Sequence, residues 1–235
     1  MTPVVEMSGV VKSYSGLRPL RIESLSIAES ERVAIAGLDA VGAEVFVNLV
    51  TGASVPDTGE VRVFGRNTAA VADGDEWLAS LDAFGIVTGR AVVLEGSTVG
   101  QNLALPFTLE IDPLAAETLA QVRRLADECE IAPQWIEQRA GEVPAEVRAR
   151  LHFARAIALE PRLLLMEHPT ANLPEADRVA FGALVARVGE ARRLTVLAMT
   201  LDPVFAAHAS QRTLTLQPAT GKLEAPRRRW GFSKF

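Results

Sequence analysis

The chain has 235 residues, of which 49% are hydrophobic and 23% are charged, so it can bury a full core and intrinsic disorder is excluded. Its net charge of −5 argues against a general nucleic-acid-binding protein. The single cysteine, Cys129, cannot form an internal disulfide, which fits a reducing compartment. No apolar stretch approaches the roughly 18 to 20 residues that a transmembrane helix needs.

The first quarter of the chain is predicted to consist mainly of strands. Alternating apolar residues, or a short β-branched run, predict strands over residues 4–7, 21–27, 32–36 and 60–65. A loop after Gly37 leads to a predicted helix over 45–50, which ends near Gly52. The turn Pro56-Asp57-Thr58-Gly59 precedes the last strand, because proline presets φ and glycine supplies a positive φ.

The second half is predicted to alternate helices with buried strands. The region from about 76 to 150 has a helical pattern, with candidate helices over 114–129, 135–139 and, continuing past it, 146–159. Continuous apolar runs over 163–166 and 194–199 are typical of strands that are buried on both faces of a parallel sheet. With a helix predicted over 177–188 between them, the pattern indicates an α/β fold with a mostly parallel core sheet and a helical insertion.

Several stretches occur in a characteristic order and spacing. The first stretch covers residues 31–37 and leads into a glycine loop. The other stretches are V-T-G…P-D-T-G-E-V over 50–61, S-T-V-G-Q-N-L-A-L-P over 97–106 and A-R-A-I-A-L-E-P-R-L-L-L over 154–165. Together they resemble the ATP-binding subunit of ABC transporters over about residues 3–218. The resemblance implies an ABC-type P-loop NTPase fold with an N-terminal antiparallel β subdomain. It also implies one nucleotide-binding domain over 1–218, with a helical subdomain over about 90–150, and a tail over 219–235.

The stretch that matches the family's phosphate loop departs from it. The family reads G-x-x-x-x-G-K-S/T, in which the lysine neutralises phosphate oxygens and the hydroxyl binds Mg²⁺. Gly37 and Gly42 keep the framing glycines, whereas Ala43 stands at the lysine position and Glu44 at the hydroxyl position. Asp39 adds another acid, and like charges at ~4 Å repel by about 4 kcal/mol at an effective dielectric near 20. We therefore expect weakened binding of ATP and Mg²⁺ and assign no cofactor.

The other motif positions that the resemblance assigns are altered as well. Gly89 falls where the family has a glutamine, and Leu201 falls where it has the switch histidine. The family's D-E-P reads Glu167-His168-Pro169, so Glu167 keeps a carboxylate and is a weak candidate metal ligand. The signature L-S-G-G-Q corresponds to Val143, Pro144, Ala145, Glu146 and Val147, and the D-loop includes Asn172, Leu173 and Pro174. We predict no catalytic residue among these positions.

Four of the assigned positions have two interpretations each. Tyr14 is similar to the aromatic residue that stacks on adenine in the family, or it is a tyrosine at a strand end. Asp39 and Glu44 either repel phosphate or, as we favour, are solvated loop carboxylates without a ligand. His168 either replaces the glutamate as general base or, as we favour, is a polar residue left at a site that no longer catalyses.

The end of the chain alternates cations with aromatic residues. The cations Arg227, Arg228, Arg229 and Lys234 stand among Trp230, Phe232 and Phe235, and the last ten residues hold no acid. Such a segment suits contact with anionic lipid or with an acidic partner, and the alternative is a solvated chain end.

The resemblance also implies partners and a location. Family members dock on transmembrane permease subunits at the cytoplasmic, inner face of the cell membrane, and each ATP site is shared by two chains. Changes at both the phosphate loop and the signature therefore predict a pseudo-ATPase that pairs with a second ABC ATPase subunit as a heterodimer. Two alternatives stay open: a residual ATP-binding subunit or slow ATPase, and a soluble regulatory module outside a transporter. No nucleic-acid partner is expected.

Overall fold

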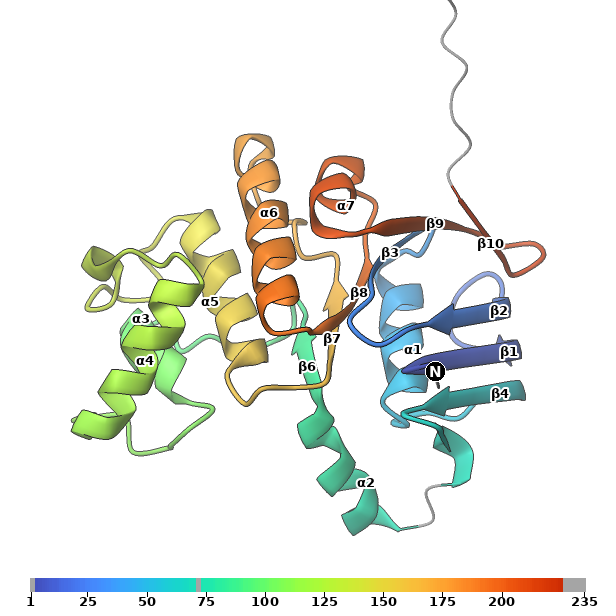
Figure 1. Cartoon of the computed structure of the whole chain (residues 1–235), viewed down its shortest axis with the longest axis horizontal. Helices are drawn as coiled ribbons and strands as arrows, with labels where there is room; N and C mark the ends of the chain where they lie inside the picture. Colours follow the sequence, from blue (N-terminus) through green and yellow to red (C-terminus); the bar gives the residue numbers. More distant parts are fainter. Residues whose placement is uncertain (1–2, 71–72, 226–235) are drawn as a thin grey trace, which may run out of the picture.

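A computed structural model describes residues 3–70 and 73–225, which form two sheets with helices between and beside them (Figure 1). The strands are β1 (Val5–Lys12), β2 (Leu20–Ile27), β3 (Arg32–Ala36), β4 (Thr58–Val63), β5 (Arg66–Asn67), β6 (Phe84–Val87), β7 (Leu163–Glu167), β8 (Thr195–Met199), β9 (Arg212–Gln217) and β10 (Lys222–Glu224). The α-helices are α1 (Ala40–Val50), α2 (Gly74–Ser80), α3 (Val99–Ala104), α4 (Ala116–Glu128), α5 (Ala145–Ile157), α6 (Glu175–Ala191) and α7 (Pro203–Ala209). Short 3₁₀ turns cover Thr68–Ala70, Leu81–Ala83 and Pro133–Trp135.

The N-terminal strands form an antiparallel sheet in the order β2-β1-β4-β5. Val5 of β1 lies opposite Ile27 of β2 and Val63 of β4. Strand β1 runs past its predicted end at residue 7, with a register shift around Gly9, where φ is +59°. A Cβ on Gly59 would lie 2.3 Å from the carbonyl oxygen of Gly9, so this close approach requires glycine. The antiparallel β subdomain that the sequence predicts is confirmed.

The larger sheet has six strands in the order β10-β9-β3-β8-β7-β6, and β9, β3, β8, β7 and β6 are mutually parallel. All five residues of β7 and all five of β8 are buried, which confirms the prediction of strands covered on both faces. Leu163 and Leu165 face one core, together with α1 and the antiparallel sheet. Leu164 and Met166 face the other core, together with α5, α6 and α7. The predicted α/β fold with a mostly parallel sheet is therefore confirmed.

The middle of the chain differs in places from the helical prediction. Residues 84–87 form β6, the edge strand of the parallel sheet, and the predicted helix over 135–139 is only the end of a 3₁₀ turn. The helices α3, α4 and α5 lie together at one end of the molecule (Figure 1). Helix α3 begins with a capping box, in which Thr98 and Gln101 satisfy each other's backbone N–H groups.

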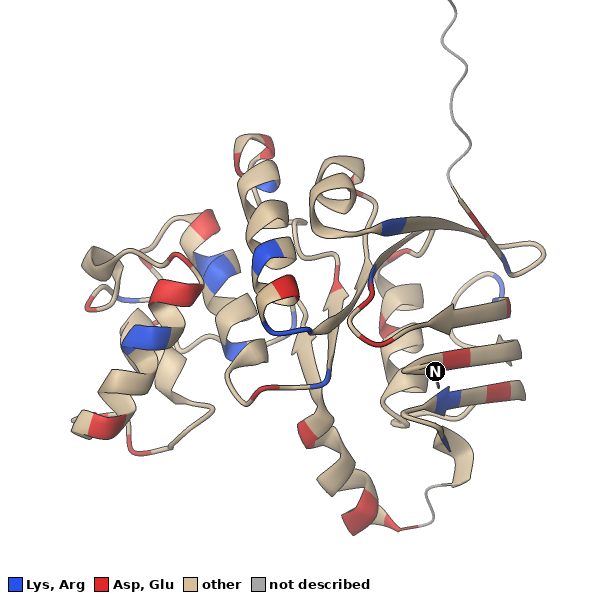
Figure 2. Ribbon diagram, viewed as in Figure 1, with Lys and Arg blue, Asp and Glu red and all other residues tan. Residues whose placement is uncertain are grey.

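Ion pairs join the helical end to the rest of the fold, and charged residues of both signs lie along its helices (Figure 2). Glu128 at the end of α4 binds Arg192 after α6 through two contacts of 2.6 and 2.5 Å. Arg187 of α6 and Arg150 of α5 both contact Glu130, at 3.1 and 3.7 Å. These pairs fasten α4 to α5 and α6 on the side away from the carboxyl ends of the strands.

The C-terminal part continues the sheet further than the sequence predicts. Strand β10 pairs with β9 in an antiparallel hairpin, with Lys222 opposite Gln217. The predicted tail over 219–235 therefore begins inside this hairpin, and residues 219–225 belong to the described fold. The basic aromatic residues 227–235 lie outside the described residues. In the parts that the structure describes, no helix combines the length and apolar character that crossing a membrane requires.

Candidate functional site

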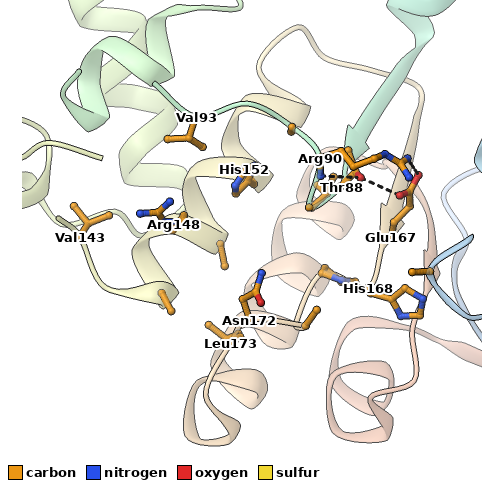
Figure 3. A pocket seen from close by; sticks show the side chains of 18 of the residues that line it. Thr88, Arg90, Val93, Val143, Arg148, His152, Glu167, His168, Asn172 and Leu173 are labelled. Carbon is orange, nitrogen blue, oxygen red and sulfur yellow. Dashed lines mark hydrogen bonds and ion pairs between the residues drawn. The ribbon is translucent and has the colours of Figure 1, made fainter. Parts of the chain in front are cut away.

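A cleft of about 760 Å³ opens at the carboxyl ends of β6 and β7 (Figure 3). Its walls come from the loop after β6, the first half of α5 and the loop after β7. Of the sequence-predicted positions it brings together Gly89, Val143, Ala145, Glu167, His168, Asn172 and Leu173. Two further basic side chains of α5, Arg148 and His152, also line it. Ligand clefts of α/β sheets lie at this edge of the strands.

An arginine joins two of the predicted positions at one side of the cleft. The Arg90 guanidinium contacts the Glu44 carboxylate at 2.6 Å through Nη1 and the Glu167 carboxylate at 2.9 Å through Nη2. The hydroxyl of Thr88 donates to the second oxygen of Glu167 at 2.9 Å. The Glu167 side chain is only 6% exposed, whereas those of Arg90 and Glu44 are about half exposed, at 51% and 41%. The buried carboxylate is thus both hydrogen-bonded and paired, as burial of a charge requires.

The phosphate-loop segment starts its helix earlier than the sequence predicts. Helix α1 begins at Ala40, and Asp39 is its N-cap, because its carboxylate accepts a 2.7 Å hydrogen bond from the Gly42 N–H. The interpretation of Asp39 and Glu44 as carboxylates without a ligand stays a prediction, but both have partners within the protein and Glu44 does not lie in a loop. Asp39 caps the helix, and Glu44 lies within α1 and pairs with Arg90. Ala43, at the lysine position, is fully buried in the core beneath this helix.

Tyr14 lies in a separate hollow of about 440 Å³, which Gly37, Asp39 and Gly42 also line. Its ring folds back over its own loop, since a Cβ on Gly16 would lie 2.4 Å from the ring carbon Cε2. The hydroxyl oxygen lies 3.7 Å from where a Cβ of Gly42 would stand. Burial and the nearby Asp39 carboxylate raise the pKa of Tyr14 above its usual value of 10.0. Tyr14 thus packs toward the start of α1.

The signature and switch positions present no convergent set of phosphate ligands. Val143 and Val147 are buried against the helical core, and Pro144 precedes α5 without a side-chain capping bond. Glu146 lies in the first turn of α5, where a carboxylate is stabilised by the helix dipole. Leu201 is 63% exposed at the tip of the loop after β8.

The loop that follows β7 is held by backbone and side-chain hydrogen bonds. His168 adopts a φ of +42° while its N–H donates to the Met199 carbonyl oxygen at 2.8 Å. Its Nε2 is buried and meets no hydrogen-bond partner among the described residues. Further along, Thr170 donates to Asp202 at 2.8 Å, and the Leu173 carbonyl accepts from Arg178 at 3.2 Å. Pro174 then precedes α6. Among the described residues, no carboxylate pairs with the His168 imidazole to orient it as a general base.

These residues do not fit an ATP-bound Mg²⁺ ion. Phosphate loops bind anions through free backbone N–H groups and a lysine, and hydroxyl and carboxylate oxygens hold the metal. Here the Asp39 carboxylate accepts the Gly42 N–H, no lysine side chain stands at position 43, and a guanidinium joins Glu44 to Glu167. Protein partners thus occupy the Gly42 N–H and both carboxylates.

Arg90 is the residue of this site that the sequence interpretation missed. In the segment Val87-Thr88-Gly89-Arg90, the resemblance indicates only that the family's glutamine is missing at Gly89. A signal was present in the sequence, because two predicted metal-side positions carry Glu44 and Glu167 and need a counter-charge. One basic residue one position after Gly89 supplies it. Cys129, by contrast, behaves as expected for an apolar residue: it is fully buried, and burial raises its pKa to about 12.

Comparison with known proteins matches more than half of this chain to one family model. The family model described as "ABC transporter" matches residues 20–171. The chain is 27% identical over 228 residues to the methionine import ATP-binding protein MetN of Brucella abortus (strain 2308), covering 95% of this chain and 60% of that protein. It is 28% identical over 218 residues to the lipoprotein-releasing system ATP-binding protein LolD of Saccharophagus degradans, covering 89% and 93%. The chain thus spans about 60% of the length of the methionine import relative.

The fold also matches solved structures over nearly the whole chain. The dimeric post-hydrolysis structure of the ATP-binding cassette MJ0796, bound to ADP and Pi, aligns with a TM-score of 0.75. That alignment has 22% sequence identity and covers 95% of this chain and 99% of the other. At this level of identity the likeness concerns the fold.

Proposed function

This chain belongs to the ABC transporter family, and we propose that it is an ATP-binding-subunit homologue that does not hydrolyse ATP and serves its transporter as a structural or regulatory partner. The observation that carries this proposal is the state of the phosphate loop. The Asp39 carboxylate takes the Gly42 N–H at 2.7 Å, and position 43 contributes a buried methyl group instead of an ammonium. A polyphosphate would meet a carboxylate at the start of α1 and no lysine.

The loss of hydrolysis is further supported on the catalytic side. Hydrolysis needs a group that takes a proton from water, held within hydrogen-bond reach of a carboxylate or another orienting group. His168 has no such partner among the described residues. The Glu167 carboxylate has both oxygens engaged, one by Thr88 and one by Arg90. We propose that none of these residues is catalytic.

The transporter role rests on the family and on the relatives' names. The similar proteins include import and lipoprotein-releasing ATP-binding proteins, so the proposed partners are transmembrane permease subunits at the cytoplasmic face of the membrane. We propose pairing with a second, intact ABC ATPase subunit, because two copies of this chain would hold no working phosphate loop. One nucleotide-binding domain over 1–218, with the hairpin strand β10 added, would supply the docking surface. The basic residues after 226 would contact anionic lipid.

A second candidate function is residual nucleotide binding without the metal. Tyr14, Gly37 and Gly42 line one hollow, which favours a site that still accepts part of a nucleotide. Isothermal titration separates the two candidates: the pseudo-ATPase predicts no heat of binding at micromolar Mg-ATP. Micromolar affinity would establish the second candidate in its place.

The decisive experiment measures ATP turnover by the purified chain beside a Glu167→Gln variant. We expect equal, background rates from both proteins. Turnover in the wild type that the variant lacks would refute the proposal, since contaminating ATPases would act in both samples. Purification of the tagged chain from solubilised membranes tests the transporter role: we expect permease subunits to copurify. Recovery from the soluble fraction alone would instead favour a regulatory module outside a transporter.

A further inference from the structure

One guanidinium links three segments that are distant in the sequence. Arg90 follows β6, Glu44 lies in α1 and Glu167 ends β7, and the two ion pairs measure 2.6 and 2.9 Å. The Arg90 backbone N–H also contacts the hydroxyl of Thr88 at 3.3 Å, and that hydroxyl donates to Glu167. The cluster is therefore a closed network of two carboxylates, one hydroxyl and one fixed cation (Figure 3 shows its Thr88, Arg90 and Glu167).

The cluster has the oxygen ligands of a hard metal ion. Carboxylate and hydroxyl oxygens are the groups that Mg²⁺ and Mn²⁺ prefer. When the shared cation is removed, the two carboxylates repel each other. Burial strengthens this repulsion, and the Glu167 side chain is only 6% exposed. A planar guanidinium can bridge two carboxylates without the dehydration that a divalent ion requires.

We infer that Arg90 is a resident cation that takes the place of a divalent metal and holds the loop after β6 on α1 and β7 when neither metal nor nucleotide is bound. This inference deepens the proposed function and rests on it, because Glu44 and Glu167 stand at its metal-side positions. The protein's own guanidinium then offsets one of the two carboxylate charges at this edge of the sheet. The arrangement of residues 88–91 against α1 becomes independent of Mg²⁺.

Neighbouring contacts make the effect of Arg90 local. Beyond residue 91 the same loop is anchored separately, since the Asn102 amide binds both the N–H and the carbonyl of Leu94 at 2.9 and 3.0 Å. Arg155 holds the Val92 carbonyl at 2.6 Å. Removing the Arg90 side chain should therefore loosen residues 88–91 and the start of α1, while residues 94–102 keep their protection.

The test compares Arg90→Ala with Arg148→Ala, which removes an arginine from the same cleft. Arg148 pairs with Glu95 at 3.2 Å and contacts neither Glu44 nor Glu167. Thermal unfolding is followed in MgCl₂ and in NaCl of equal ionic strength, without nucleotide. We expect Mg²⁺ to raise the melting temperature of Arg90→Ala by about 2–4 °C more than that of the wild type. A modest stabilisation by a bound ion shifts the melting temperature of a domain of this size by that amount. Arg148→Ala and the double variant Arg90→Ala/Glu44→Gln should respond as the wild type does.

Hydrogen exchange supplies the second readout. The backbone amides of residues 88–91 should exchange faster in Arg90→Ala than in the wild type, and Mg²⁺ should return them toward wild-type protection. If the alanine variant does not fold, Arg90→Gln serves in its place. Equal Mg²⁺ responses in wild type and Arg90→Ala, or unchanged exchange at 88–91, would overturn the inference. Because these measurements use no ATP, they stand apart from the turnover assay: ATP hydrolysis by the wild type would refute the proposed function, whatever the variants do in Mg²⁺.

Discussion

The carboxylate of Asp39 is predicted to stabilise the fold while it opposes anion binding. It caps α1 through the 2.7 Å bond from Gly42, and the first turn of that helix holds no other acid. Replacement by alanine removes the cap, which is worth about 1 kcal/mol, and a favourable dipole contact of about 0.3–1 kcal/mol for an exposed group. We therefore expect Asp39→Ala to lower the free energy of unfolding by about 1–2 kcal/mol.

The assay is urea denaturation, with Asp39→Ser as the matched control. A serine hydroxyl caps nearly as well as a carboxylate but carries no charge. With a slope of about 2–3 kcal/mol/M, the alanine variant should unfold at a urea concentration lower by about 0.5 M. The serine variant loses only the dipole contact and should unfold between the alanine variant and the wild type. Excess inorganic pyrophosphate should then stabilise Asp39→Ser more than the wild type, because the repelling charge is gone.

Two results would contradict this reasoning. If Asp39→Ala unfolds at the wild-type urea concentration, the carboxylate does not cap α1 in solution. If pyrophosphate has the same effect on Asp39→Ser and the wild type, the charge of Asp39 is not what keeps anions from the start of the helix. The first result concerns stability and the second concerns the site, so each can fail alone.

Three further measurements test separate features. Gly85→Ala would place a Cβ 2.2 Å from a carbonyl oxygen of α5, so we expect a loss of at least about 1–3 kcal/mol in urea denaturation, whereas Gly74→Ala, with no atom within 4 Å, should cost nothing. Burial and two neighbouring arginines lower the pKa of His152 below 6.5, so the unfolded chain binds its proton first as the pH falls. Stability should therefore be full above pH ~6.5 and decline below it, and His152→Gln should flatten this decline; parallel pH profiles of wild type and variant would show that His152 has no part in it. Tyr14 is the only tyrosine, so ultraviolet titration reports on it alone: its pKa should lie above 10.0 and fall in Asp39→Ser, and an unchanged titration would mean that the carboxylate does not act on the hydroxyl.

Much of the fold could be predicted because it depends on local patterns. The apolar runs over 163–166 and 194–199 can only be covered on both faces, and the structure buries them between two cores. The order of strands and helices around them indicated an α/β fold, and the resemblance of several sequence stretches to the ABC family implied its type. Elements whose patterns are short were missed: β6 has four residues, β10 has three, and α7 has seven. Their pairing with neighbours, more than their own propensity, makes them regular.

The candidate site, too, could be predicted from the sequence only in part. The sequence by itself determined which residue types occupy the phosphate-loop, signature and metal-side positions, because these follow from order and spacing along the chain. Only the tertiary structure decided what those residues do: Asp39 turns back onto its own helix, and Arg90 meets Glu44 and Glu167, which are 46 and 77 positions away. The physical reason is that a cap is satisfied within a few residues, whereas a counter-ion is selected by distance in space, and the parallel sheet sets that distance by bringing the ends of β6 and β7 beside the start of α1.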